Sequence, residues 1–325
     1  MERTMTLSKL LAMTLTAIVY LCAPALGQDQ YPSRTITIIA PLSPGTTIDL
    51  LARLFADKLS KRFGQQVVVL NRPGAGGLIA AQTVTTSPAD GYTLLLANSG
   101  HAILGTLNKN LPFDPIGDFA GISMIGEAPA IVVVPPSLGV TSLREFVDVA
   151  KAKPGTINYG SAGIGTATHL AGAYFALQTD TNLVHIPYTV SSTIITDLLS
   201  GRIQASFVPL AFVLSLVQNG KLTALAAAAK TPVTNPINIP TALSQGIDYQ
   251  YATWYGILAS AKTPKAALKI LHQAISEASE DPELQAKIRA QGIEPQDIGL
   301  ENFDAYIRND MARLAPLLKT ISERH

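Results

Sequence analysis

Short apolar runs recur along the chain and alternate with segments of helical periodicity. Because many of these runs are apolar at successive positions, they predict strands covered by helices on both faces of a sheet. The predicted strands are 35–41, 66–70, 92–98, 130–135, 156–160, 183–188, 205–209, 222–229 and 255–260. Between them, apolar residues lie three or four positions apart, as at Ile48, Leu51 and Leu59, which predicts helices. This alternation predicts an α/β fold with mainly parallel sheets.

After Pro264 the pattern contains only helical spacing. Two apolar stripes are present, at positions 267, 270, 271, 274 and 275 and at positions 303, 307, 311 and 314. Pro282 lies between them and suits the first turn of a helix, where a missing N–H costs nothing. The segment from Pro264 onward is therefore expected to be helical throughout.

The first 27 residues have the three parts of a secretory signal peptide. Arg3 and Lys9 supply the basic start, residues 10–21 the apolar run, and residues 25–27 a small-residue cleavage site. An uncleaved membrane anchor and a lipoprotein attached through Cys22 are the alternatives. The apolar run is short for a membrane span, and Leu21 precedes Cys22 where a lipoprotein needs a small residue. Cleavage and export to the periplasm are therefore expected.

Composition adds little chemistry to the mature chain. Cys22 is the only cysteine, so cleavage would leave neither a thiol nor a disulfide. Without the first 27 residues the chain carries 22 basic and 22 acidic side chains. A neutral protein gives no reason to expect binding to nucleic acid or to an anionic membrane surface. Its length is sufficient for two lobes, each with its own core.

Residues 158–172, NYGSAGIGTATHLAG, resemble a phosphate-binding loop that lacks its lysine. Gly160 and Gly165 have P-loop spacing, but Thr166 and Ala167 follow where Lys and Ser or Thr belong. The dinucleotide-binding spacing fails in the same segment and again in residues 74–79. Nucleotide chemistry is therefore not predicted.

Hydrolytic and metal chemistry are also weakly supported. Ser161 and Ser99 each lack the leading glycine of a nucleophile elbow. The five histidines form no close ligand pair, so no metal site and no cofactor are expected. An exported hydrolase that uses Ser161 or Ser99 with a histidine such as His169 stays open as the less favoured alternative.

Three segments rich in glycine and hydroxyl residues each run from a predicted strand end into a helix. They are residues 41–55, 97–103 and 158–172. A helix start presents unpaired N–H groups and a partial positive charge, so it can hold a small anion without lysine or arginine. In open α/β sheets, ligands bind at the carboxyl ends of the strands. Ordinary helix capping explains the same residues equally well.

These segments, together with NRPGAGG (71–77), DGYTLLLANSG (90–100) and VHIPY (184–188), resemble one family throughout the mature chain. They are similar to the substrate-binding receptors of the tripartite tricarboxylate transporter family, also called Bug or TctC-like receptors. The resemblance implies a periplasmic, two-lobed receptor with the type II periplasmic binding protein fold. The ligand cleft would lie between the lobes, and strands near 130–135 and 255–260 would be the two crossings. Residues 28–126 plus 251–325 would form one lobe and residues 127–250 the other.

The resemblance also implies a set of ligand-binding residues and a partner. One lobe would contribute Ser43, Thr46, Thr47 and Asp49, and the other Ser161, Gly165, Thr166 and His169, with Asn98 and Ser99 at the cleft floor. Backbone amides and hydroxyls of these loops would hold a carboxylate, which explains the missing lysine. No catalytic residue is implied, and a monomer would deliver its ligand to the membrane subunits of a transporter. Asp49 and His169 could contact the ligand or brace their own loops.

Several positions depart from the family pattern. Thr46 replaces the second glycine of the first loop, Thr189 and Val190 replace a basic residue and glycine, and Val208 replaces an Asp. A less charged second lobe implies a pocket that tolerates an apolar or aromatic ligand body. A sensor that presents its closed form to a signalling partner is the alternative to a transport receptor.

Overall fold

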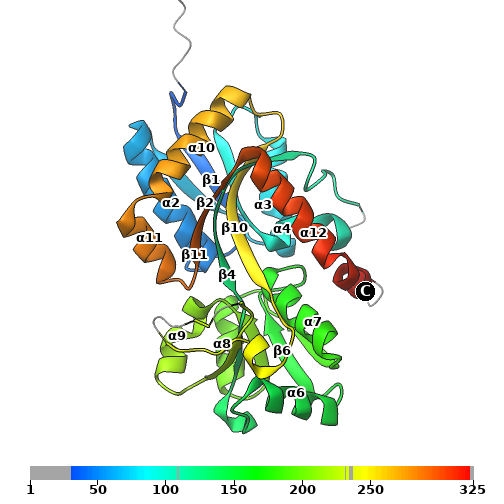
Figure 1. Ribbon diagram of the computed structural model, residues 1–325. Coiled ribbons are helices and arrows are strands. Elements are labelled where there is room, and N and C mark those ends of the chain that lie inside the picture. Colours follow the sequence, from blue (N-terminus) through cyan, green and yellow to red (C-terminus); the bar gives the residue numbers. More distant parts are fainter. Residues whose placement is uncertain (1–30, 108–109, 231, 234–236, 323–325) are drawn as a thin grey trace, which may run out of the picture. The chain divides into compact units, whose positions relative to one another are not determined.

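The computed structural model describes residues 31–107, 110–230, 232–233 and 237–322 of the chain (Figure 1). The expected signal peptide, residues 1–27, lies outside these residues. Within the described ranges, no helix combines the length and apolar character needed to cross a membrane. Residues up to Ser33 and residues from Arg34 onward are separate units, and the architecture below is that of the second unit.

All nine predicted strands are present, and two further strands accompany them. The strands are β1 (Ile36–Ala40), β2 (Val67–Asn71), β3 (Thr93–Asn98), β4 (Phe119–Pro129), β5 (Ile131–Val134), β6 (Ile157–Ser161), β7 (Leu183–Pro187), β8 (Ala205–Val208), β9 (Thr223–Ala227), β10 (Ala252–Ser260) and β11 (Glu294–Gly299). The expectation of helices alone after Pro264 is wrong, because β11 lies in that segment. Its sequence is polar and contains Pro295, as an edge strand allows.

The helices begin and end close to the predicted stripes. They are α2 (Thr47–Phe63), α3 (Leu78–Thr86), α4 (Ser99–Ala102), α5 (Leu104–Leu107), α6 (Leu143–Ala152), α7 (Ala167–Thr179), α8 (Ser191–Leu199), α9 (Leu210–Gln218), α10 (Lys265–Ser279), α11 (Pro282–Arg289) and α12 (Leu300–Ser322), with 3₁₀ turns η1 (Ala75–Gly77), η2 (Pro136–Leu138) and η3 (Leu243–Gln245). Ile48, Leu51 and Leu59 of α2 are buried, as the spacing predicts. Pro282 is the first residue of α11.

The strands form two sheets of mixed direction. One sheet has the order β11-β4-β10-β3-β1-β2 and the other has the order β7-β6-β8-β5-β9. Pairs β1–β2, β1–β3, β6–β7 and β6–β8 are parallel, whereas the pairs made by β4, β5 and β10 are antiparallel. The expectation of mainly parallel sheets is therefore wrong. Strands β4, β5 and β10, which lead into or out of the connections between the sheets, are antiparallel to their neighbours. The apolar runs in the sequence do not show the direction in which a strand crosses its sheet.

Two adjacent stretches of backbone connect the sheets. The first passes from β4 through Ala130 into β5, and the second passes through Tyr251 into β10. Ala130 N–H donates to Tyr251 O (3.0 Å), and Tyr251 N–H donates to Ala228 O (3.0 Å). The second crossing thus lies before the expected 255–260, because β10 pairs along its whole length with β4. Figure 1 shows β4 and β10 side by side above this point.

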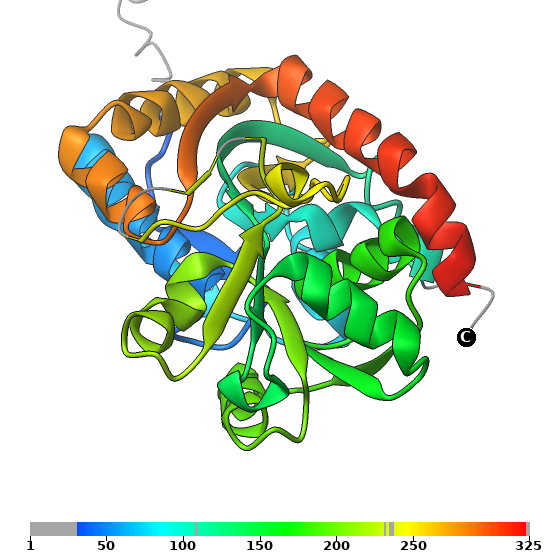
Figure 2. The same ribbon diagram turned by 60° about the horizontal axis from the view of Figure 1, so that its bottom comes forward.

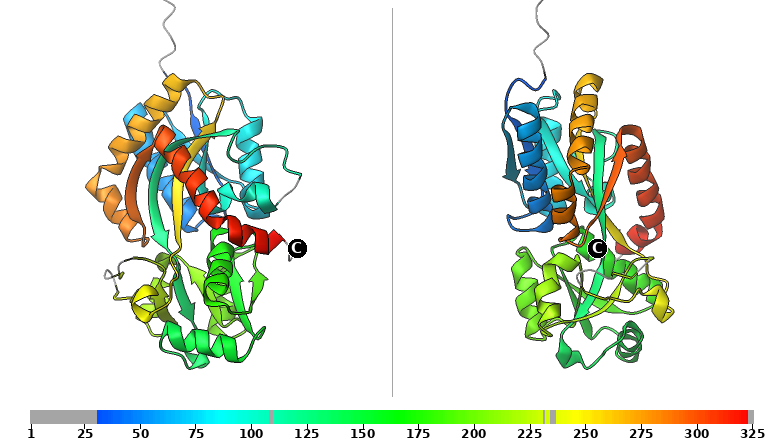
Figure 3. Two further views of the ribbon diagram at one scale, coloured as in Figure 1. Left: turned by 45° about the vertical axis from the view of Figure 1, so that its right-hand side comes forward. Right: turned by 60° about the vertical axis from the view of Figure 1, so that its left-hand side comes forward.

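Each sheet has its own core, and we call each sheet with its packed helices a lobe. In the first lobe, α3 and α12 share a core cluster with β3 and β10, and α2 packs against α10. In the second lobe, Phe146, Phe175 and Phe207 lie at the centre of the core. Helix α12 (red) runs along β4 and reaches α7 (green) in Figures 2 and 3.

Candidate functional site

Helices α2 and α7 begin with the same cap, although they belong to different lobes. Thr46 and Thr166 are the N-caps, with φ, ψ of −78°, 160° and −75°, 159°. Each threonine Oγ1 accepts the N–H of the residue three positions on, at 3.5 Å in α2 and 3.4 Å in α7. Gly45 and Gly165 precede the caps with φ of 82° and 80°, a region open to glycine.

The cap threonines also close the loops that lead into the helices. Thr46 Oγ1 donates to Ser43 O (2.9 Å), and Thr166 Oγ1 donates to Gly163 O (2.7 Å). We call residues 43–46 the first glycine loop and residues 163–166 the second glycine loop. The two loops have the same local hydrogen bonding, so they present their helix starts in the same way.

Asp49 and His169 brace these loops from equivalent positions in the first turn. Asp49 Oδ2 accepts the Gly45 N–H (2.9 Å), and His169 Nδ1 accepts the Gly165 N–H (3.2 Å). Each loop needs a hydrogen-bond acceptor for its glycine N–H. The Asp49 carboxylate supplies one, and the unprotonated Nδ1 of His169 supplies the other. Asp49 and His169 are 3% exposed, so both side chains are held beneath their loops.

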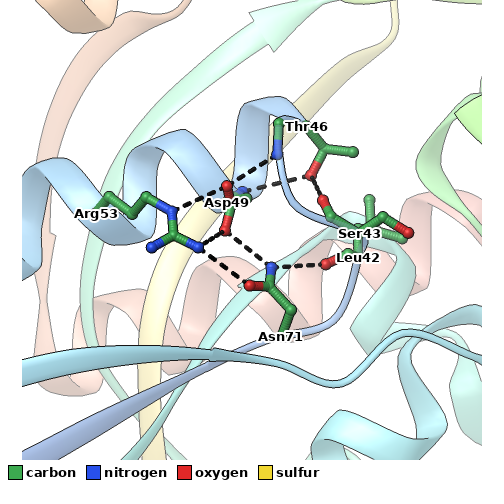
Figure 4. A network of polar contacts seen from close by, with 7 residues as sticks. Leu42, Ser43, Thr46, Asp49, Arg53 and Asn71 are labelled. Carbon is green, nitrogen blue, oxygen red and sulfur yellow. Dashed lines mark hydrogen bonds and ion pairs between the residues drawn. The ribbon is translucent and has the colours of Figure 1, made fainter. Parts of the chain in front are cut away.

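Asp49 is the centre of a network that Figure 4 shows. Arg53 donates to both of its carboxylate oxygens (2.9 and 3.1 Å), and Asn71 Nδ2 donates to Oδ1 (2.8 Å). Burial by itself would raise the pKa of Asp49. The hydrogen bonds from Arg53, the Gly45 amide and Asn71 outweigh burial and hold the pKa below its usual value. Asn71 also donates to Leu42 O (2.9 Å), so the network ties strand β2 to the first glycine loop.

His169 belongs to a buried polar group beneath the second glycine loop. Its ring stacks on His185 with centroids 4.0 Å apart, and His185 Nε2 lies 2.6 Å from Ser161 Oγ. Ser161 Oγ is also bonded to the Gly163 carbonyl (3.2 Å) and amide (3.1 Å). Ser161 has no exposed surface. A serine held in this way supports the loop.

A cavity of about 80 Å³ lies where the two helix starts meet strands β3, β4 and β10. One water needs roughly 10–15 Å³ of such space, so the cavity has room for a small organic molecule. Its lining includes the N-cap and the first two residues of α2 and of α7: Thr46, Thr47, Ile48, Thr166, Ala167 and Thr168. The cavity is therefore bordered by both lobes.

The helix starts supply backbone donors to this cavity. The first intrahelical bonds are Leu50 N–H to Thr46 O and Leu170 N–H to Thr166 O. The amides of the first two residues of each helix lie ahead of these bonds and have no partner inside the helix. Both helix dipoles place partial positive charge at the same ends. The arrangement suits an anion that accepts hydrogen bonds from two directions.

Side chains add donors from the strands. Asn98 Oδ1 accepts the Gly100 N–H (3.0 Å), while Asn98 Nδ2 has no hydrogen-bond partner among the described residues. Tyr255 lies directly opposite Asn98 in the sheet and is 3% exposed. Its hydroxyl also makes no hydrogen bond within the described part of the chain. Thr253, two residues earlier on β10, lines the cavity as well.

Four of the ten predicted site residues line the cavity, namely Thr46, Thr47, Asn98 and Thr166. The other six, Ser43, Asp49, Ser99, Ser161, Gly165 and His169, lie outside its lining. Ser99 is 1% exposed and accepts the Trp254 N–H (3.1 Å), so it joins α4 to β10. Across the described ranges, no group of His, Asp and Glu side chains is placed to hold a metal ion.

Thr168, Thr253 and Tyr255 also line the cavity and are not among the predicted site residues. Thr168 lies two residues after the predicted Thr166, where helical geometry already places a second free amide. Thr253 and Tyr255 are on the strand that returns from the second lobe, and both point to the face that carries Asn98. Because Thr253 and Tyr255 are two positions apart, a strand places both on the same face of its sheet. The order of the strands is needed to know that this face also carries Asn98.

Two α/β lobes, two connecting crossings and a cavity between opposed helix starts define a type II periplasmic binding protein fold. The chain belongs to the receptor family described as "Tripartite tricarboxylate transporter family receptor", whose model matches residues 51–322. The expected family resemblance is therefore confirmed.

Individual relatives agree with this assignment. Protein BugT of Bordetella pertussis is 31% identical over 300 residues, which cover 91% of this chain and 92% of BugT. A solved structure described as that of a periplasmic transporter has a TM-score of 0.83 and 32% identity, covering 91% of this chain and 98% of that one. R. palustris Rpa4515, solved with adipate, has a TM-score of 0.83 and 29% identity, covering 89% and 98%.

Proposed function

We propose that this chain is a periplasmic receptor that binds a small organic anion, a mono- or dicarboxylate, and delivers it to a tripartite transporter. One observation carries the proposal: two identically capped helix starts, one from each lobe, border one cavity. The family assignment and the adipate in the Rpa4515 structure support a carboxylate as the ligand. The expected signal peptide supports a periplasmic location.

Binding in this receptor would close the lobes without chemistry on the ligand. Residues 28–126 plus 251–325 would move against residues 127–250 around the two crossings. A carboxylate that accepts hydrogen bonds from both helix starts contacts both lobes only when they are closed, so binding shifts the population to that form. Hydrogen bonds to a charged group contribute about 1.5–3 kcal/mol each, so four or five would suffice for roughly micromolar affinity after ordering costs.

The ten predicted residues would divide into two roles. Thr46, Thr47, Asn98 and Thr166 would border the carboxylate. Ser43, Asp49, Ser99, Ser161, Gly165 and His169 would hold the loops and β10 in place. The receptor would act as a monomer, and its closed form would dock on the membrane subunits.

A thermal-shift screen followed by titration calorimetry tests the proposal. The panel contains aliphatic and aromatic carboxylates, amino acids, sugars and inorganic phosphate. Thr47→Val removes a cavity hydroxyl and keeps the side-chain shape, and the exposed Thr86→Val on α3 is the matched control. We expect carboxylate hits whose affinity falls about tenfold in Thr47→Val, the scale of one hydrogen bond to a charged group, and not in Thr86→Val. Sugar or phosphate hits with silent carboxylates would overturn the proposal.

A further inference from the structure

The polar side chains and the large apolar side chains that line the cavity come mainly from different elements, and we call these two parts of the lining the polar end and the apolar end. The polar lining of the cavity comes from the starts of α2 and α7 and from β3 and β10. Its apolar lining in the second lobe comes from α8, β8 and the start of α9: Ile194, Phe207, Val208, Pro209 and Phe212. Ile194 and Val208 belong to the buried core of the second lobe, and Phe212 packs against it half-buried.

No charged side chain is found among the described residues that line the cavity. Arg53 lies near the first glycine loop, but its guanidinium is bound to Asp49 and Asn71. The positive potential in the cavity therefore comes from helix starts. Those of α2 and α7 bring threonine side chains with their free amides, whereas that of α9, at the apolar end, brings backbone amides beside Pro209 and Phe212.

The apolar end lacks side-chain groups that could hold a second anion. The N-caps of α8 and α9 are Val190 and Pro209, neither of which has a hydroxyl or an amide side chain. A carboxylate pressed against Val208 and Phe212 would lose hydration without gaining a charged partner, and burying an unpaired charge is costly. A hydrocarbon chain or an aromatic ring at the same place would gain free energy from the apolar area it buries.

We infer that the ligand has a single carboxylate and an uncharged apolar body, as in a straight-chain or aromatic monocarboxylate. This inference rests on the proposed function, because it assigns the carboxylate to the helix starts. The body lies toward Ile194, Val208 and Phe212. A dicarboxylate of the same length binds more weakly, because its second charge falls in the apolar end.

Titration calorimetry of the protein, purified after expression of the full chain, tests the inference with matched six-carbon ligands. The ligands are hexanoate, adipate and 1-hexanol, with benzoate and acetate as further probes. We expect hexanoate or benzoate to bind at least tenfold more tightly than adipate, and 1-hexanol to bind more weakly than hexanoate. If adipate binds as tightly as both monocarboxylates or more tightly, the inference is overturned and the proposed carboxylate receptor stands.

Two other outcomes distinguish a failure of the proposed carboxylate receptor from a failure of the inferred apolar monocarboxylate. If 1-hexanol binds as tightly as hexanoate, the carboxylate is not recognised and the proposed function itself is wrong. If neither hexanoate nor benzoate binds at millimolar concentration, the apolar monocarboxylate is excluded.

A pair of variants locates the apolar body. Phe212→Gln makes the apolar end polar at a half-buried position, and Leu177→Gln makes the same change at an exposed position of α7 outside the cavity. We expect at least a fivefold loss of hexanoate affinity in Phe212→Gln and no change in Leu177→Gln. Equal hexanoate affinity in the two variants would place the body elsewhere and overturn the assignment.

Discussion

His101 is a buried titratable side chain whose charged form the fold opposes. It lies on α4, 6% exposed, with Nε2 2.8 Å from Pro115 O and its ring edge-on to Phe119. Burial lowers its pKa from the ordinary 6.5 to about 4, although the bond to Pro115 O acts in the opposite direction. Below pH 6.5 the unfolded chain therefore binds a proton that the folded chain does not.

This difference predicts a loss of stability in mild acid. Stability rises with pH wherever the unfolded state binds more protons, so the contribution of His101 is complete above pH 6.5 and falls as pH drops toward 4. Between pH 7.5 and pH 4.5, we expect the wild type to lose about 2–3 kcal/mol more than His101→Gln. Urea unfolding curves at several pH values measure this difference. Parallel pH dependence in the two proteins would show that His101 is not responsible.

At the scale of elements, the loops of the two lobes touch through glycines. A Cβ on Gly76 would come within 2.9 Å of Ile164 O, and a Cβ on Gly100 would come within 2.9 Å of Gly165 O. Gly76 has φ of 65°, so an added side chain there would also strain the backbone. Gly100 has no such restriction, so its lack of a side chain matters for the approach of the second glycine loop.

Gly100→Ala should therefore hinder lobe closure. The methyl group would meet Gly165 O at 2.9 Å, closer than a real side chain approaches, and Asn98 Oδ1 at 3.1 Å, a tight contact. Ligand affinity should fall about tenfold or more, because the binding-competent form becomes less populated. Calorimetry gives the affinity, and small-angle X-ray scattering with saturating ligand shows whether the lobes stay apart.

Gly105→Ala is the matched control for this experiment. It adds the same methyl group to the neighbouring helix α5, where the nearest atom is Pro115 Cγ at 3.4 Å. We expect wild-type affinity and closure in the control. Wild-type affinity in Gly100→Ala as well would mean that the closed form does not require this close approach.

Most elements were predictable, because they are local patterns. The nine apolar runs became strands, and the spacing of Ile48, Leu51 and Leu59 marked the buried face of α2. Strand β4 was not predicted, because Gly121 and Gly126 interrupt its apolar run. A Cβ at Gly121 would meet Phe303 at 2.8 Å, and one at Gly126 would meet Glu294 O at 2.9 Å, so these glycines serve long-range packing.

The candidate site was predictable only in its local parts. The cap threonines and free amides follow from a glycine-threonine pair before a helical stripe. The bracing roles of Asp49 and His169 depend on which acceptor reaches the Gly45 and Gly165 amides, and the sequence left that open. Tyr255 reaches the site through its pairing with Asn98, which is a property of strand order.

At the scale of the whole molecule, α12 adds a third link between the lobes. Leu314 is fully buried in the core of the second lobe, although α12 starts on the first sheet. The Arg313 guanidinium lies 5.8 Å from the ring centre of Tyr174 on α7 and 5.9 Å from that of Tyr251 at the second crossing. Asp310 holds Arg313 at 2.7 Å and accepts the Trp254 Nε1–H, so this link is anchored in the first lobe.

Removing the ring of Tyr174 should therefore favour the open form. Tyr174→Leu deletes the aromatic face that Arg313 meets and leaves the ion pair of Asp310 and Arg313 intact, whereas Tyr174→Phe keeps the face. A cation–π contact of an exposed guanidinium contributes about 0.5–1 kcal/mol, so ligand affinity should fall roughly two- to fivefold in Tyr174→Leu. Tyr174→Phe should stay close to wild type in calorimetry.

Scattering from the ligand-free proteins separates a hinge effect from a general loss of stability. If the contact holds the lobes together, Tyr174→Leu should show a larger radius of gyration than Tyr174→Phe under conditions where both remain folded. Equal radii of gyration and equal affinities would mean that the contact between Arg313 and Tyr174 does not affect the equilibrium between the open and closed forms. Arg313 meets α7 and the second crossing, and Asp310 ties it to Trp254 of β10. A positive result would therefore make the C-terminal helix part of the hinge, alongside the two crossings.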